Sequence, residues 1–197
     1  MKKLLLFSAA LMLANLLFAQ EFSTQLASAK TAYSAGKLAD AHFSLEQAMQ
    51  EIDMIVGKEI LKVLPEKMGD STLDPKEDHV MANVGFLGAT IHRSYGTNGS
   101  QVEIISNSPM IATLNSFLNM PILGGMMRNE TTKVVKIQGY KSRLEKTGDN
   151  ENGKPNYTLQ VPFNNALLSI TADGMTEKDV MAFADGIPME KIAKMIQ

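Results

Sequence analysis

The sequence predicts an α+β protein in which an N-terminal helical hairpin precedes an antiparallel β-sheet of about five to six strands covered by helices. Apolar residues recur at helical spacing from Glu21 to Met68, whereas short strand-like runs separated by turn residues dominate the rest. Strands do not alternate with helices as they do in parallel sheets. We therefore expect three parts: residues 1–20 as a signal peptide, 21–68 as a helical hairpin, and 69–197 as an α+β antiparallel-sheet domain.

The first twenty residues have the pattern of a secretory signal peptide. Lys2 and Lys3 form a basic start, an apolar stretch runs from Leu4 to Phe18, and cleavage is expected between Ala19 and Glu21. The apolar stretch is shorter than the roughly 20 residues that span a bilayer. The sequence thus predicts export through the inner membrane to the periplasm or the exterior. It excludes a lipoprotein, since the lipid attaches to a cysteine and the chain has none.

Composition excludes several classes of function. Without cysteine there are no disulfides, thiolate nucleophiles or cysteine-ligated metals. The 19 basic and 21 acidic side chains include Lys2 and Lys3, so the chain expected after removal of residues 1–20 has a net charge of −4. This balance predicts no binding of nucleic acid, which needs a concentrated basic surface. No other stretch is apolar for 18 residues, so the mature chain is expected to have no transmembrane segment.

The hairpin is predicted from its apolar spacing and its central glycine. One helix is expected at about Ser23–Ala35 and a second from about Leu38 until Pro65 and Gly69, with Gly36 at the turn. The second helix carries its apolar residues at Leu38, Ala41, Leu45, Ala48, Ile52, Ile55, Val56, Ile60, Val63 and Leu64.

The stretch Ala32 to Ala41, followed by Leu45 and Ala48, resembles one tetratricopeptide repeat over about residues 25–58. Such a repeat implies two antiparallel helices held by small and apolar residues, and in arrays it forms a peptide-binding groove. Gln25 and Ser28 depart from the family pattern, and no second copy follows, whereas solenoids need about three. We therefore predict a helical hairpin, with a repeat-type peptide groove as the alternative.

The clearest β-hairpin surrounds Asn98 and Gly99, which favour a two-residue turn. Strands are expected at about 84–95 and 101–106, with Tyr95 opposite Val102 and Arg93 opposite Ile104. One face of this ribbon would then be apolar: Leu87, Ala89, Ile91, Tyr95, Val102 and Ile104. The other would carry Thr90, His92, Ser94, Glu103 and Ile105.

The remaining elements follow from capping and turn residues. Ser108 and Pro109 predict a helix start that continues to about Asn119. Strands are expected at about 131–138, 140–146, 157–161 and 166–171, and Thr176 with Asp179 predicts a capped closing helix. The layout of signal peptide, sheet and closing helices resembles that of small exported bacterial proteins, a resemblance that implies export and no particular activity.

No catalytic or metal site is predicted from motifs. His42, His79 and His92 have no spacing that brings two imidazoles to one metal, and no cofactor-binding motif is present. His42 and Glu46 lie one helical turn apart, which is typical of an exposed contact. His92 and Glu103 share a ribbon face, which favours a polar cross-strand pair and leaves an acid/base pair as the alternative.

The stretch from Pro109 to Met127 is the candidate binding surface. It is rich in methionine, and methionine surfaces adapt to varied apolar partners. The residues assigned to this binding site are Met110, Leu114, Phe117, Leu118, Met126 and Met127. The alternative is a helix that simply packs on the sheet.

The sequence therefore predicts an exported, non-enzymatic binding or interaction protein of the bacterial cell envelope. Its partner would be an envelope protein or an apolar ligand, and the hairpin would contribute an assembly surface. The alternative is an envelope enzyme whose polar site, with His92 and Glu103, is assembled only in the fold.

Overall fold

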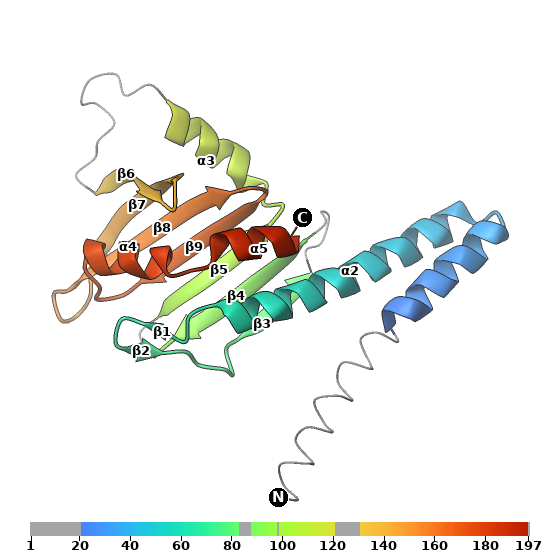
Figure 1. The fold of residues 1–197 in the computed structure, drawn as a ribbon, viewed down its shortest axis with the longest axis horizontal. Coiled ribbons are helices and arrows are strands. Elements are labelled where there is room, and N and C mark those ends of the chain that lie inside the picture. The colour runs from blue at the N-terminus through green and yellow to red at the C-terminus, as the bar shows by residue number, and fades with distance from the viewer. Residues whose placement is uncertain (1–20, 83–87, 98, 121–130, 197) are drawn as a thin grey trace, which may run out of the picture. The chain divides into compact units, whose positions relative to one another are not determined.

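A computed structural model describes residues 21–82, 88–97, 99–120 and 131–196. The described chain has the expected α+β architecture, with two N-terminal helices followed by an antiparallel sheet and further helices (Figure 1). It divides into two compact units, Met1–Ile55 and Val56–Gln197. We call residues 21–55 the hairpin unit and Val56–Gln197 the sheet unit.

The hairpin unit contains helix α1 (residues 21–34) and most of helix α2 (Leu38–Val63). The chain turns between them at Gly36, where φ is 73°. That left-handed conformation suits glycine because it has no Cβ, so the predicted turn is confirmed.

The sheet unit contains the last two turns of α2 and all the strands that the structure describes. A two-stranded ribbon, β1 (Lys67–Met68) with β2 (Ser71–Thr72), follows α2, where the sequence predicted no strand. The main sheet has seven antiparallel strands in the order β3-β4-β5-β9-β8-β7-β6, one or two more than expected. Its strands are β3 (His79–Ala82), β4 (Ala89–Tyr95), β5 (Ser100–Ser106), β6 (Thr132–Ile137), β7 (Tyr140–Asp149), β8 (Pro155–Phe163) and β9 (Ala166–Ala172).

The predicted β4–β5 register is wrong by two residues. Tyr95 pairs with Ser100 and Arg93 with Val102, because the connection is longer than a two-residue turn and has left-handed glycines at Gly96 and Gly99. A shift of two residues keeps every side chain on its face. The apolar and polar faces are therefore as predicted for the described residues, while Leu87 lies outside them.

Helices cover both faces of the sheet, whereas the sequence predicted helices on one face. Helices α4 (Glu177–Asp185) and α5 (Met189–Ile196) share one core with the end of α2 and the sheet (Figure 1). Helix α3 (Met110–Asn119) packs against Leu167, whose neighbour Leu168 belongs to the main core. Because successive strand residues point to opposite faces, α3 lies on the second face.

The predicted caps are present. Thr176 Oγ1 accepts a hydrogen bond from the backbone N–H of Asp179 at 3.3 Å and donates to its carboxylate at 2.6 Å. Ser108 Oγ accepts from the backbone N–H of Met110 at 3.3 Å. Both helix starts therefore satisfy backbone groups that would otherwise lack a partner.

Arg93 anchors the end of α2 from within the apolar face of the sheet. Its guanidinium donates to the Leu64 carbonyl at 3.1 Å and to both carboxylate oxygens of Asp78, the shorter bond being 2.6 Å. Tyr95 donates its hydroxyl hydrogen to the Pro65 carbonyl at 2.8 Å. Burial raises the pKa of Tyr95 to about 12, so this hydroxyl remains protonated at neutral pH.

Candidate functional site

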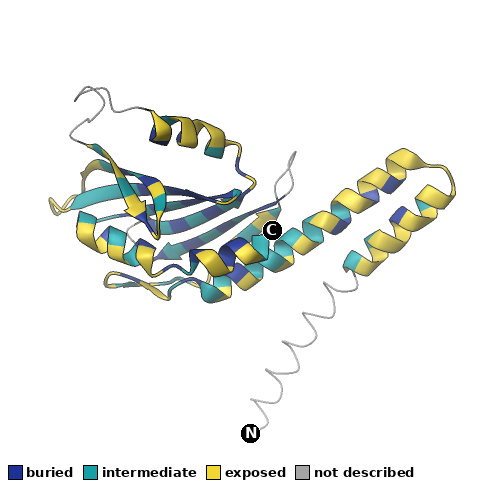
Figure 2. Ribbon diagram, turned by 45° about the horizontal axis from the view of Figure 1, so that its top comes forward, coloured by how far each residue is buried: buried dark blue, intermediate teal, exposed yellow. Residues whose placement is uncertain are grey.

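The hairpin unit reverses the usual burial of apolar residues. The residues buried within it are small, namely Ala29, Ala41, Ser44 and Ala48. The large ones are exposed, including Tyr33 at 70%, Leu45 at 48% and Leu26 at 47% of their surface. Figure 2 shows the two helices as mostly exposed, with isolated buried positions.

Exposed large apolar residues are concentrated in this small unit. Eight of the twelve in the described chain belong to it: Leu26, Tyr33, Leu38, Phe43, Leu45, Met49, Ile52 and Ile55. The much larger sheet unit contributes only Met81, Met110, Met120 and Val134. Scattered exposed apolar residues are normal, but a concentration of this kind marks an interaction surface.

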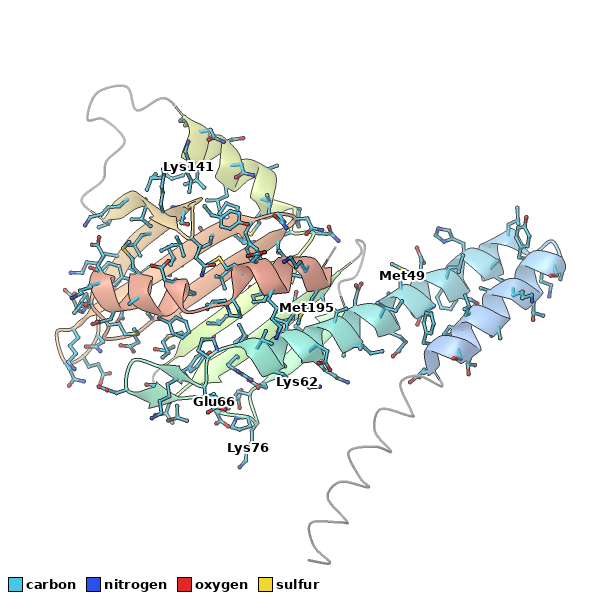
Figure 3. The ribbon with its side chains drawn as sticks, in the orientation of Figure 1. Met49, Lys62, Glu66, Lys76, Lys141 and Met195 are labelled. Atoms are coloured by element: carbon cyan, nitrogen blue, oxygen red, sulfur yellow. The ribbon has the colours of Figure 1, made fainter. Side chains whose placement is uncertain are left out.

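One side of the hairpin is an apolar groove of about 620 Å³, lined by Leu26, Ala29, Tyr33, Ala41, Leu45 and the stem of Lys30, with Ser23 and Ala27 at its margin. Leu38 lies seven residues before Leu45 and Met49 four residues after it, so helical spacing places both on the same side of α2 as Leu45; Figure 3 labels Met49 on this helix. We call Leu26, Tyr33, Leu38, Leu45 and Met49 the apolar face.

The opposite side of the hairpin carries no large apolar side chain in its groove. That groove is lined by Ser23, Thr24, Ala27, Ser28, Thr31, Ala32, Ala35, Lys37, Asp40 and Ser44. The two grooves of the hairpin therefore differ in side-chain size: large apolar residues line the first, whereas small and polar residues line the second. Phe43, which is 61% exposed, follows Asp40 at helical spacing and lies outside both grooves.

The methionine-rich binding site is only partly described. Leu114 and Leu118 are buried against Leu167, while Met110 is 54% exposed. Met126 and Met127 lie outside the described residues. The assignment of a binding surface to this segment therefore stays a prediction.

Helix α3 has polar contacts that fix it on the sheet. Phe117 is half-buried beneath the guanidinium of Arg143, whose Cζ lies 5.7 Å from the ring centroid. Lys141 reaches from β7 and donates to Asn119 at 3.0 Å (Figure 3). These contacts and the buried leucines support the interpretation of α3 as a helix that packs on the sheet.

His92 and Glu103 lie directly opposite each other on β4 and β5, so the predicted cross-strand neighbours share a face as expected. His92 Nε2 is hydrogen-bonded to Ser94 Oγ at 3.0 Å, and its ring stacks on that of His79 with centroids 4.5 Å apart. Burial lowers the pKa of His92, and His79 lowers it further, against the opposing effect of Glu103. The group is a polar network across three adjacent strands.

The lowered pKa of His92 predicts a loss of stability in mild acid. The unfolded chain binds a proton near pH 6.5 and the folded chain only at lower pH, so stability is complete above about pH 6.5 and falls as pH decreases below it. The charged groups that face His92 are His79, Glu103, Glu77 and Asp78. We expect His92→Gln to flatten the pH dependence of urea unfolding between about pH 5 and 7.

His42→Gln is the matched control for this test, because His42 is exposed on the hairpin and contacts only Glu46 among the ion pairs of the described residues. It should leave the pH dependence as it is in the original chain. Equal slopes for His92→Gln and the original chain would show that His92 does not sense pH through folding.

A polar pocket of about 1150 Å³ lies where the β7–β8 connection meets the segment after β9. Its side chains bind one another: Asn150 donates to the Asp173 carboxylate at 2.7 Å and accepts backbone bonds from Asn152 and Lys154 at 3.0 Å. Among the described residues, no group of three or more acidic or histidine side chains is arranged to hold a metal ion. Asn150 and Asp173 thus hold the loops beside this pocket in shape.

The fold and the site together define an exposed apolar hairpin joined to an α+β antiparallel-sheet unit. Comparison of the chain with protein-family models, with curated proteins and with solved structures found no match. In the part of the chain that the structure describes, no helix combines the length and apolarity of a membrane span.

The exposed apolar side of the hairpin was not identified from the sequence, which predicted an assembly surface on the hairpin. It assigned an assembly role to the hairpin but named no residues, because apolar spacing alone reads as a buried stripe. The distinguishing signal is residue size: alanine and serine occupy the contact between the helices at positions 29, 41, 44 and 48. The larger residues beside them must then face outward.

Proposed function

We propose that the chain is an exported, non-enzymatic interaction protein of the bacterial cell envelope that binds its partner through the apolar face of the hairpin unit. The observation that carries this proposal is the inverted burial in that unit, with small residues inside and large apolar residues outside. The sheet unit follows the hairpin unit along the chain and folds around its own core.

The free energy available on this face supports binding. Burying a large apolar side chain that was exposed contributes about 1.5–3 kcal/mol. Tyr33, the most exposed of the five, offers both ring area and a hydroxyl, the combination that is enriched among residues that dominate interface energies. A partner that covers the apolar face also removes a surface that is otherwise prone to nonspecific association.

Export is part of the proposal and rests on the first twenty residues. Their basic start, apolar stretch and small residue at Ala19 are the features that a secretion apparatus recognises. A chain without cysteine is also suited to an oxidising compartment, since it has no thiol to cross-link there.

The proposal predicts that Leu45→Glu abolishes a specific complex without unfolding the protein. The chain is expressed in its own host, cross-linked in intact cells and purified, and its complexes are measured by mass. Because Leu45 is about half exposed, the substitution should change the free energy of unfolding by less than about 0.5 kcal/mol. It places a charge in the apolar face, which should remove the complex.

Ser28→Glu is the matched control, since it adds the same charge to the opposite, polar side of the same hairpin. The complex should survive in this variant. Loss of the complex in both variants, or in neither, would contradict binding through the apolar face.

A further inference from the structure

We propose that the partner of the apolar face is a second copy of this chain, so that two hairpins form a four-helix bundle with both turns at the same end. This inference rests on the proposed function and specifies its partner. Three properties of the hairpin unit carry it: its size, the area of its apolar face and the placement of its charges.

The hairpin gains little stability from its own contacts. It has fewer than about 40 residues, a length below which disulfides, metals or association are usually needed. The chain has no cysteine, and the described residues offer no metal-binding cluster. Its internal contact consists of Ala29, Ala41, Ser44 and Ala48, which bury little apolar area. Association through the apolar face would add the apolar burial that these contacts lack.

The size of the side that carries the apolar face fits a weak dimer. The segment of α2 in this unit, residues 38–55, is about 27 Å long and α1, residues 21–34, is about 21 Å long at 1.5 Å per residue, and each helix is about 10 Å wide. Each copy therefore offers a side of about 480 Å², which includes the apolar face. Two such sides together come to about 960 Å², close to the roughly 1,000 Å² at which specific interfaces begin, so the dimer is expected to depend on concentration.

The charges beside the face select one arrangement. Lys30 lines the apolar groove on α1. Glu46, which His42 contacts at 3.5 Å, directly follows Leu45 on α2, so helical geometry places it on the side of Leu45 that is turned away from α1. The two helices run antiparallel from the turn at Gly36, so Lys30 is level with Ala41. Glu46 is then about 7 Å further along the axis, within reach of a lysine side chain.

A two-fold axis parallel to the helices sets α1 of one copy over α2 of the other. Lys30 then lies beside Glu46 of the second copy on both sides of the axis. The alternative, with the turns at opposite ends, sets α1 over α1 and α2 over α2, so Lys30 faces the helix that carries Lys30 and not the one that carries Glu46. The lysine–glutamate pairing is lost in that arrangement, so the electrostatics favour turns together.

The dimer is tested first by sedimentation of the purified full chain over a range of concentrations. The original chain and Ser28→Glu should dimerise, whereas Leu45→Glu should weaken the dimer at least about 30-fold, as expected for a central interface residue. Lys30→Glu and Glu46→Lys should each weaken it up to about fivefold, and the double exchange should restore it. Failure of the double exchange to restore the dimer would overturn this arrangement.

The orientation is tested by cysteine pairs, which are unambiguous because the chain has no cysteine of its own. A mixture of Tyr33→Cys and Leu38→Cys chains of different mass should form mixed disulfide dimers, because these positions meet when the turns lie together. A mixture of Tyr33→Cys and Ser23→Cys should not. Preferential cross-linking of the second mixture overturns the arrangement, and this readout does not depend on any variant that adds a charge.

Failure of this inference is distinct from failure of the proposed function. A chain that stays monomeric, yet loses a cellular complex on Leu45→Glu, would refute the second copy and keep the apolar face as a binding surface. A monomer whose cellular complexes are unaffected by Leu45→Glu would refute both.

Discussion

Replacing Arg93 with alanine is expected to lower the free energy of unfolding of the sheet unit by about 3–5 kcal/mol. The guanidinium is only 6% exposed, pairs with Asp78 at 2.6 Å and donates to the carbonyl of Leu64. Its removal leaves a partly buried carboxylate and a helix-end carbonyl without their donor, which is more costly than the loss of the ion pair itself. Urea unfolding followed by circular dichroism measures the effect.

The double variant Arg93→Met with Asp78→Leu should be more stable than Arg93→Ala, because it leaves neither charge unpaired. Lys194→Ala is the comparison for an exposed pair: Lys194 contacts Glu190 at 2.7 Å on the surface of α5, and its loss should have no measurable effect on unfolding. An Arg93→Ala chain as stable as Lys194→Ala would mean that Arg93 does not hold the end of α2.

Replacing Gly57 with leucine is expected to destabilise the sheet unit by about 2–3 kcal/mol, the upper part of the range for overpacking. At Gly57, helix α2 lies directly against the side chains of Val80 and Ile91 on the sheet. A Cβ placed there would overlap the side chain of Val80 and lie 3.2 Å from Ile91 Cγ1. Both neighbours are β-branched and stiff, so the helix itself must move.

The variant Gly57→Ala distinguishes the gain in helix propensity from the cost of overlap with Val80. Glycine to alanine in a helix interior favours the helix by about 1 kcal/mol, which offsets part of the overlap. Glu59→Leu, on an exposed position of the same helix, tests whether leucine alone is responsible and should be near neutral. Equal stabilities for the leucine variants at 57 and 59 would show that the close contact is not tight.

The fold class was predictable because each element has a local cause. Helical spacing, the turn at Gly36 and the capping pair Thr176 and Asp179 act within a few residues, and all of them are present in the structure. The β4–β5 register was not predictable from Asn98 and Gly99 alone, because Gly96 also adopts a left-handed conformation and lengthens the connection. Strand β3 was missed because it is short and follows a polar, turn-rich segment.

The candidate site was less predictable than the fold. Helical spacing identifies an apolar stripe on α2 but does not indicate whether these residues pack within the protein or contact a partner. The role of Arg93 was equally unpredictable from the sequence. Its ion pair with Asp78 and its hydrogen bond to the carbonyl at the end of α2 join segments that are distant along the chain. Both features depend on contacts between segments distant in sequence.

The central claim, that the apolar face is covered by a partner in the cell, is tested most directly with two single cysteines. Leu45→Cys and Ser28→Cys lie on opposite sides of the hairpin and are both exposed in the isolated chain. Intact cells are treated with a membrane-permeant maleimide, and the labelled fraction is compared with that of the unfolded chain. We predict that position 45 is protected while position 28 reacts fully. Equal, complete labelling at both positions would contradict the account.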